Sequence, residues 1–313
     1  MTELERERRA AHEGALLEHA TELGSIVVTG ADRRRWLNGL VTCELAKLEP
    51  GGGAYGLSVA KVGKILAELW IVAAEDRLLV GVRRDRVPEL LDHFNRHIMM
   101  EDAEVADASA DLGWLRIHGP LAGELALVAR GAGATGAAAV AWSDLGGAAV
   151  VAPSGKLEDI TSALLAHAGE RGVLATPEAF EAIRIEEGIA RYGVDFDEQH
   201  YPQDASLEKL AVSFQKGCYL GQETVFMLGV RGHAKKRLVQ LAVDGADDVP
   251  VGAPITAPDD GAEVGKVTSR TKAPEGAGVI ALGYVKYKLA AAGAELQVAG
   301  RPARITRAPA PKS

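Results

Sequence analysis

The chain has 313 residues, with 43 acidic and 35 basic side chains and a formal net charge of −8. This length predicts two or three domains, and 47% hydrophobic with 25% charged residues is typical of a globular protein and excludes a wholly disordered one. The acidic balance argues against a general nucleic-acid-binding protein, and no apolar run reaches the ~20 residues that span a bilayer. We therefore expect neither nucleic acid nor a membrane as a partner.

The two cysteines, Cys43 and Cys218, lie far apart and form no CxxC pair. Two thiols also fall short of the four thiolates that usually hold an iron–sulfur cluster. The charged N-terminus lacks the apolar segment of a signal peptide. We therefore expect no metal site and a reduced, cytoplasmic setting.

Taken in chain order, the first part of the sequence predicts alternating helices and strands. The predicted elements are a charged helix over 3–23, a strand over 25–30, a helix over 32–45, strands over 53–59, 64–73 and 77–82, and a helix over 85–98. A strand that ends at a glycine and leads into a helix recurs about 90 residues later, over 113–118 and 121–130. The recurrence predicts two related α+β subdomains.

The stretch from Gly131 to Gly136 matches the pattern GxGxxG. A dinucleotide site needs a strand directly before this pattern and a helix opening from it. Here a predicted helix precedes it and a predicted strand over 138–142 follows. We interpret the stretch as a loop.

Later in the chain the pattern changes from helical to β. A helix is predicted over 156–170, and another begins with Thr176 as N-cap and Pro177 at its first position. From Lys236 onward, short apolar strands such as 238–243 and 279–284 alternate with turns. This predicts a separate C-terminal β-barrel or sandwich.

The first candidate site is the stretch from Phe214 to Glu223. Cys218 lies between two glycines and close to Lys216, so its sulfur can be presented on a turn beside an ammonium group that favours the thiolate. A buried structural cysteine is the alternative, and local chemistry does not decide between them. Cys43, on the predicted apolar helix, is expected to be a core residue.

The second candidate site is the stretch from Arg184 to Asp195. Glu186 ends an apolar helix, where a carboxylate without partners is costly to bury. It can accept two parallel N–H bonds from a heterocycle such as a pterin or a guanine, and Tyr192 can stack on that ring. The alternative is a salt bridge from Glu186 to Arg184 or Arg191.

A third candidate is a basic cluster near the start of the predicted barrel, made of Arg231, Lys235, Lys236 and Arg237. On an acidic chain such a cluster can hold an anionic ligand tail or a phosphate. The alternative is an ordinary solvated surface. His233 can act as a base for Cys218 only if the fold brings the two together.

These residues carry a resemblance to a known family. The stretch Lys216-Gly-Cys-Tyr-Leu-Gly-Gln-Glu223 resembles the KGCYxGQE motif of the YgfZ family, whose members bind tetrahydrofolate, are linked to iron–sulfur protein maturation, and are related in fold to the glycine-cleavage T-protein, an aminomethyltransferase. Further stretches are similar to segments of that family: 30–42, 184–195, 264–269 and 280–285.

The resemblance implies an α+β, T-protein-like fold of three subdomains, with a C-terminal β-barrel and a central folate channel. Residues 1–230 are then two α+β subdomains, discontinuous in sequence and divided near 110, and residues 231–313 are the barrel. Tetrahydrofolate or a one-carbon derivative is the implied cofactor. Its predicted contacts are Glu186, Tyr192, Asp195, Arg231 and Arg237.

The sequence also departs from the related patterns. The T-protein has a catalytic aspartate pair where this chain has Ala67 and Glu68, so ordinary aminomethyl transfer is in doubt, although Glu68 can substitute in part. An arginine that often follows the cysteine motif is Met227 here.

The resemblance therefore predicts a tetrahydrofolate-binding protein of iron–sulfur cluster assembly or repair, with iron–sulfur client or assembly proteins as partners. Cys218, Lys216 and Glu68 are its candidate catalytic residues. The alternatives are a folate-dependent aminomethyl or methyl transferase and a non-catalytic scaffold, so the question of enzymatic activity stays open.

Overall fold

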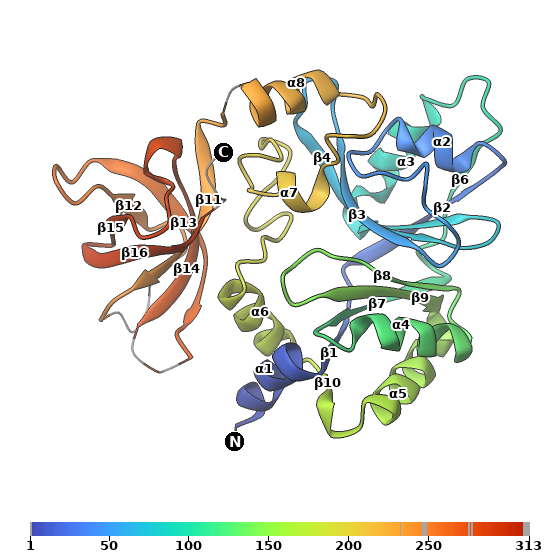
Figure 1. Ribbon diagram of the computed structural model, residues 1–313, viewed down its shortest axis with the longest axis horizontal. Coiled ribbons are helices and arrows are strands. Elements are labelled where there is room, and N and C mark those ends of the chain that lie inside the picture. Colours follow the sequence, from blue (N-terminus) through green and yellow to red (C-terminus); the bar gives the residue numbers. More distant parts are fainter. Residues whose placement is uncertain (1, 232, 246–248, 275, 277, 309–313) are drawn as a thin grey trace. The chain divides into compact units, whose positions relative to one another are not determined.

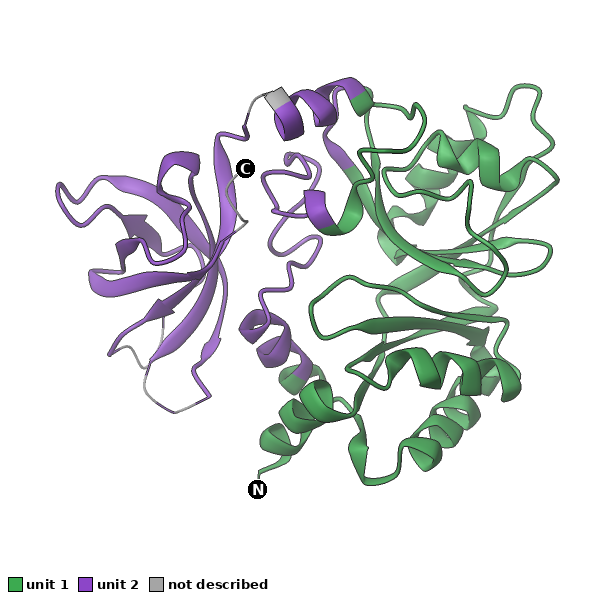
Figure 2. Ribbon diagram, in the orientation of Figure 1, with its two compact units in different colours: residues 1–61, 66–179, 210–222 green, residues 62–65, 180–209, 223–313 purple. Residues whose placement is uncertain are grey.

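The computed structural model describes residues 2–231, 233–245, 249–274, 276 and 278–308. The chain divides into two compact units, which Figure 2 shows in green and purple. Unit 1 comprises residues 1–61, 66–179 and 210–222, and unit 2 comprises residues 62–65, 180–209 and 223–313. In the described part of the chain, no helix is both long and apolar enough to cross a membrane.

The first sheet of unit 1 has five strands in the order β3-β4-β5-β2-β6 (Figure 1). They are β2 (Leu23–Thr29), β3 (Gly53–Val59), β4 (Ile65–Ala73), β5 (Leu78–Arg83) and β6 (Glu104–Asp107). The helices α2 (Arg33–Asn38) and α3 (Val87–Asn95) belong to the same subdomain.

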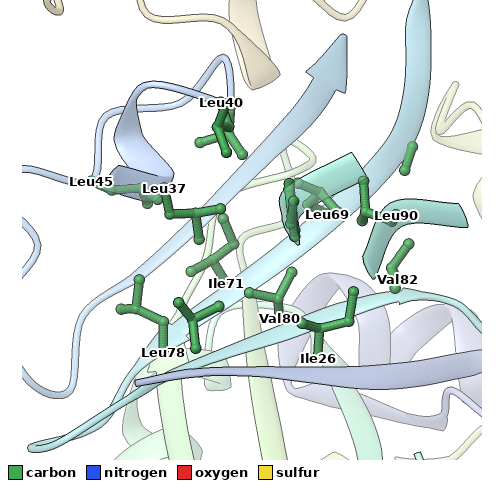
Figure 3. Close-up of a cluster of buried hydrophobic side chains, with 14 of the residues drawn as sticks. Ile26, Leu37, Leu40, Leu45, Leu69, Ile71, Leu78, Val80, Val82 and Leu90 are labelled. Atoms are coloured by element: carbon green, nitrogen blue, oxygen red, sulfur yellow. The ribbon is translucent and has the colours of Figure 1, made fainter. Parts of the chain in front are cut away.

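Alternate residues of β4 and β5 form the core of this subdomain, as the period of two along a strand requires. Figure 3 shows Ile71 and Val80 among the labelled apolar side chains, together with Leu37 and Leu90. Leu90 is contributed by α3. The same arrangement fixes which face of α3 remains available for other contacts.

The second sheet of unit 1 has the order β10-β1-β7-β9-β8. Its strands are β1 (Ala15–His19), β7 (Leu112–His118), β8 (Gly136–Ala139), β9 (Gly147–Pro153) and β10 (Gly172–Leu174). The associated helices are α1 (Glu3–Glu13), α4 (Ala122–Gly131) and α5 (Leu157–Ala168). Because β1 pairs with both β7 and β10, this sheet is discontinuous in sequence.

The N-terminal helix is shorter than predicted. We expected a helix over 3–23, but α1 ends at Glu13 and the next residues form β1. A Cβ atom at Gly14 would lie 2.1 Å from the carbonyl oxygen of Arg171, so only glycine fits at this turn. The apolar side chains that follow are then buried in the sheet, which overrides the helical pattern.

The helix predicted over 32–45 is also shorter, because α2 ends at Asn38. Cys43 therefore lies in a loop after the helix. The predicted recurrence of strand, glycine and helix is confirmed: Gly30 follows β2 and Gly119 follows β7, with φ angles of +95° and +112°. These angles favour glycine over residues with a Cβ atom.

The prediction of a loop in the GxGxxG stretch is confirmed. Helix α4 ends at Gly131 and strand β8 begins at Gly136, so helix precedes and strand follows. The strand covers 136–139, two residues earlier than the predicted start.

Unit 2 contains a closed barrel of six strands in the order β11-β14-β13-β12-β15-β16. The strands are β11 (Lys236–Val243), β12 (Pro254–Thr256), β13 (Glu263–Lys272), β14 (Val279–Lys286), β15 (Glu295–Val298) and β16 (Arg301–Arg307). The apolar side chains that alternate along these strands fill the barrel. The predicted C-terminal β-barrel is confirmed.

The segment between the α+β sheets and the barrel holds three short helices: α6 (Pro177–Glu186), α7 (Glu208–Ala211) and α8 (Gln222–Phe226). Helix α6 begins as predicted, since the hydroxyl of Thr176 accepts a hydrogen bond of 3.2 Å from the amide of Ala179. A π-helical turn over Met227–Arg231 follows α8. Most of this segment belongs to unit 2 and carries the second candidate site.

Candidate functional site

The predicted site residues are divided between the two units. Glu68, Lys216 and Cys218 belong to unit 1, and four of the five predicted cofactor contacts have described side chains in unit 2: Glu186, Tyr192, Asp195 and Arg237. The fifth prediction, Arg231, concerns a side chain that lies outside the described residues.

Lys216 holds the loop that follows α2. Its ammonium donates hydrogen bonds to the carbonyl oxygens of Asn38, Val41 and Cys43, at 2.7, 2.8 and 2.5 Å. An ammonium group has three N–H donors, so these bonds account for all of them. Burial lowers the pKa of Lys216 to about 8. Lys216 therefore joins two loops, and its predicted catalytic role beside Cys218 stays a prediction.

The loop that carries Cys218 is fixed on its other side by Leu220 and Gly221. The amide of Leu220 donates to the carbonyl of Gly39 at 2.9 Å. Gly221 has a φ angle of +79°, and a Cβ atom there would lie 2.4 Å from the carbonyl oxygen of Ala60. Cys218, between these two fixed points, is exposed. The predicted presentation of its sulfur at the surface is confirmed.

Cys43 differs from Cys218 in its exposure to solvent. It is buried, and burial raises the pKa of its thiol to about 12, against the smaller opposing effect of the Lys216 ammonium. The predicted contrast between an exposed Cys218 and a core Cys43 is therefore confirmed for their accessibility. Its predicted place on a helix is wrong, as described above.

Glu68 lies on β4 and is 8% exposed. The hydroxyl of Tyr55 donates a hydrogen bond of 2.5 Å to its carboxylate. Burial and the adjacent Glu68 raise the pKa of Tyr55 well above its usual value. The pair Tyr55–Glu68 thus places a buried carboxylate next to a phenol that stays protonated.

A buried ion cluster lies near this pair. The guanidinium of Arg116 donates to Glu18 at 2.7 and 2.9 Å and to Glu22 at 2.5 Å, and it lies 4.9 Å from the centre of the Trp70 ring. Burial acts to raise the pKa of Glu18, but Arg116 and His118 outweigh it and lower this pKa to about 2. Glu18 is therefore a carboxylate at any physiological pH.

In unit 2, Asp195 and Arg184 form a buried ion pair. The guanidinium of Arg184 donates to Asp195 at 2.8 Å and to the hydroxyl of Ser269 at 2.9 Å. The two hydroxyls of Thr268 and Ser269 donate to Asp195 at 2.5 and 2.7 Å, and the amide of Arg191 donates at 3.0 Å. Both oxygens of Asp195 are thus engaged inside the protein. This carboxylate joins α6 to β13, and its predicted contact to the cofactor stays a prediction.

Glu186 is the last residue of α6 and is half-buried. The side-chain amide of Gln240 donates to the backbone carbonyls of Ile185 and Glu186, at 2.8 and 2.7 Å, which fixes the end of the helix. The two arginines considered as its partners, Arg184 and Arg191, both form ion pairs with Glu181.

Tyr192 is buried. Its ring packs edge-on against that of Phe196, with the ring centres 5.5 Å apart.

A pocket of about 400 Å³ opens between the loop at 193–200 and the barrel. In it, His200 accepts a hydrogen bond of 2.9 Å from the ammonium of Lys236 and lies 2.7 Å from Asp197. The Lys236 ammonium also lies 4.3 Å from the centre of the Tyr284 ring, which stacks on His200 at 4.8 Å.

The basic cluster predicted at 231–237 is divided by the fold. Arg237 is buried and donates to the carbonyl of Gln203 and to the carboxylate of Glu208, both at 2.5 Å, and its predicted contact to an anionic ligand stays a prediction. Lys236 lines the pocket just described. His233, considered as a base for Cys218, stacks on Tyr287 with ring centres 4.1 Å apart.

Sequence reasoning missed the group around Lys236. Asp197, His200 and Tyr284 come from distant parts of the chain, and only the strand pairing of the barrel and the course of the 193–200 loop bring them together. The one local signal was the spacing of Asp197 and His200, three residues apart. Across the described residues, no cluster of three or more His, Cys, Asp or Glu side chains is arranged to hold a metal ion.

Comparisons with known proteins address the chain as a whole. Residues 1–143 match the family model of the GCVT N-terminal domain, and residues 236–311 match that of the glycine cleavage T-protein C-terminal barrel domain. The two matches together cover more than two thirds of the chain.

Among curated proteins, an aminomethyltransferase of Herpetosiphon aurantiacus is 27% identical, with 96% of this chain and 87% of that protein aligned. A protein of Vibrio vulnificus named tRNA-modifying protein YgfZ is 28% identical, with 70% of this chain and 68% of that protein aligned.

A solved structure shows the same fold. The glycine cleavage system aminomethyltransferase T of Bartonella henselae superimposes with a TM-score of 0.79 and 18% identity, covering 98% of this chain and 89% of its own. The predicted α+β, T-protein-like fold with a C-terminal barrel is confirmed.

Proposed function

The chain belongs to the glycine-cleavage T-protein family, and from this premise we propose that it binds a tetrahydrofolate and acts through Cys218 in the assembly or repair of iron–sulfur proteins. Membership rests on the two domain matches and the shared fold. The predicted resemblance is thereby confirmed for the wider family. The narrower relation to YgfZ, for which the match is partial, is part of the proposal.

The observation that carries the proposed role is the presentation of Cys218. Its loop is fixed by Lys216 on one side and by Leu220 and Gly221 on the other, and the thiol between them is exposed. An exposed thiol can ligate a metal ion or exchange with a disulfide of a partner, which a buried thiol such as Cys43 cannot. The partners proposed on this basis are iron–sulfur client or assembly proteins.

The proposed folate contacts lie in unit 2. Glu186 supplies a carboxylate for the amino and ring N–H groups of the pterin, and Tyr192 remains a proposed neighbour of the ring. The pocket with Lys236 supplies an ammonium for the anionic glutamate tail. Its volume of about 400 Å³ falls within the ~300–1,000 Å³ of ordinary small-molecule sites.

A folate-dependent one-carbon transferase is the second candidate. It is favoured by the similarity to aminomethyltransferases along nearly the whole chain and by the buried pair of Glu68 and Tyr55. In this alternative Glu68 lies near the reacting amine. A non-catalytic scaffold that binds no folate is the third candidate.

Calorimetry tests the folate site. We expect tetrahydrofolate to bind the wild type and Glu186→Gln to weaken binding about tenfold, because a charge-assisted hydrogen bond is worth roughly 1.5–3 kcal/mol. Glu187→Gln, at the neighbouring position, is the matched control and should leave the affinity unchanged. An unaltered affinity of the Glu186→Gln protein would show that Glu186 does not belong to the site. If the wild type binds no folate, the non-catalytic scaffold is the remaining candidate function.

Two further variants separate the functions. In a deletion strain, we expect Cys218→Ser to fail to restore the activity of iron–sulfur enzymes and Glu68→Gln to restore it. Purified wild-type protein should not transfer an aminomethyl group to tetrahydrofolate. Transfer that Glu68→Gln abolishes and Cys218→Ser preserves would establish the one-carbon transferase in place of the maturation role.

A further inference from the structure

A second cavity, of about 360 Å³, lies in unit 1 beside α3. Its lining combines apolar side chains with basic ones. Leu66, Leu90 and Leu220 are buried or half-buried, whereas Lys61 and Arg96 are exposed at its edge. An apolar interior with a few charged groups at the opening is typical of small-molecule sites.

The charge of this cavity is positive. Arg86 forms an ion pair of 3.0 Å with Glu89, the acidic residue of the lining. Lys61 and Arg96, both exposed, add two positive charges to the lining. The field at the opening therefore attracts an anion and repels a metal cation.

Two histidines form one wall of the cavity. The rings of His93 and His97 lie 4.7 Å apart, and the Nδ1 atom of His97 donates to the backbone carbonyl of His93 at 2.8 Å. The Nε2 atom of His93 is buried and has no hydrogen-bond partner among the described residues. A buried polar atom without a partner is costly, so a ligand that bonds to it gains affinity.

The protonation of His93 agrees with this arrangement. Burial, with the neighbouring His97 and Arg96, lowers the pKa of His93 to about 4. The imidazole is then neutral near pH 7 and can offer an N–H at Nε2 to an oxygen acceptor.

We propose that this cavity binds a small carboxylic acid with an aliphatic chain. The carboxylate lies between Lys61, Arg96 and the ring of His93, which turns to bring its buried Nε2 atom to the carboxylate, and the chain packs on Leu90 and Leu220. A free fatty acid of short chain and the C-terminal residue of a polypeptide with an aliphatic side chain both present this chemistry. The proposal does not depend on folate binding.

Leu220 connects the cavity with the loop that carries Cys218. Leu220 belongs to the same loop as Cys218 and is two residues away from it. A ligand in the cavity therefore contacts the segment that holds the exposed thiol.

Calorimetry on the full chain tests the site, with hexanoate as the probe. We expect hexanoate to bind and hexanol, which has the same chain without the charge, to bind at least tenfold more weakly. Arg96→Glu should weaken hexanoate binding at least tenfold. Lys47→Glu, a charge reversal at an exposed lysine outside the cavity, should leave it unchanged.

Two peptides distinguish the sources of the carboxylate. Tighter binding of Gly-Gly-Leu than of hexanoate, lost when the peptide is amidated, would identify a polypeptide C-terminus. Binding of hexanoate alone would identify a free acid. Equal binding of hexanol and hexanoate, or no loss on Arg96→Glu, would overturn the proposal.

Nuclear magnetic resonance of the histidine rings gives a second readout. Saturation with hexanoate should raise the pKa of His93 from about 4, because a carboxylate then faces its ring among Arg86, Glu89, Arg96, His97 and Lys61. Unchanged His93 signals would overturn the proposed pose. If tetrahydrofolate displaces hexanoate, this cavity is not separate from the folate site, and that part of the proposal is wrong. If the protein binds hexanoate but no folate, only the proposed function is contradicted.

Discussion

The loop at 216–223 in unit 1 and the segment at 184–195 in unit 2 have a similar arrangement of residues but differ in the charge of the buried ion. Each has a buried ion that the protein itself satisfies: Lys216 in the first and Asp195 in the second. Each also has a proposed functional group a few residues away, Cys218 and Glu186. In both segments one charged residue fixes the backbone, and we propose that the other residue acts on a ligand or a partner.

The two buried ions differ in what balances them. Lys216 is held by neutral backbone carbonyls, whereas Asp195 is held by the full charge of Arg184 together with two hydroxyls. Removing Asp195 takes from the buried Arg184 guanidinium one of its two carboxylate partners and leaves it with Glu181 alone, while removing Lys216 leaves only neutral acceptors unsatisfied. The structure thus predicts that removing Asp195 lowers the free energy of unfolding more than removing Lys216 does.

The largest effect is expected from Asp195→Ala. Loss of one partner from a buried ion pair costs up to about 3–5 kcal/mol in the free energy of unfolding, and the ion pair of Arg184 with Glu181 offsets part of that cost. Asp259→Ala, at an exposed aspartate in unit 2, is the control and should change it by less than about 0.5 kcal/mol. Urea unfolding measures both variants. If Asp195→Ala lowers the free energy of unfolding no more than the control does, Asp195 does not stabilise the segment at 184–195.

Lys216→Met should have the next largest effect. The substitution keeps an unbranched side chain but removes the charged donor from three carbonyls, which we expect to cost roughly 2–4 kcal/mol. Lys209→Met, at an exposed lysine nearby in sequence, provides the comparison. A Lys216→Met protein as stable as wild type but with an unreactive Cys218 would return Lys216 to the catalytic role predicted from sequence.

Tyr55→Phe tests whether Glu68 belongs with the buried structural ions. Glu68 then loses a donor at 2.5 Å, and a buried acceptor without its donor costs about 1–3 kcal/mol. We expect a fall in thermal stability of that order. Stability equal to wild type, with a loss of one-carbon transfer, would instead place the pair in a reaction site.

The smallest effect on stability is expected from Cys218→Ser. The residue is exposed, so the free energy of unfolding should change by no more than about 0.5 kcal/mol.

Alkylation distinguishes the two cysteines directly. With a pKa of about 12 for Cys43, only about one molecule in ten thousand carries its thiolate at pH 8, so iodoacetamide should label Cys218 first and Cys43 only in urea. Peptide mass spectrometry reads the order. Labelling of Cys43 in the folded protein would contradict the assigned burial.

Much of the fold could be predicted because it depends on local patterns. Alternation of apolar residues predicted most strands, including 53–59 without error, and the glycines after β2 and β7 marked the recurring unit. The helix predicted over 3–23 failed at Gly14, since the reason for a break there is the carbonyl of Arg171, more than 150 positions later in the chain.

For the candidate site, the sequence by itself determined which residue types are present and that Cys218 lies in a turn able to expose it. Only the tertiary structure decided what each charge does. Lys216, Asp195 and Arg237 were predicted to act on a ligand or in catalysis, and the structure adds partners for each of them that the local sequence does not indicate. The physical reason is that a buried ion is governed by the donors and acceptors around it, and these are fixed by packing and not by spacing along the chain.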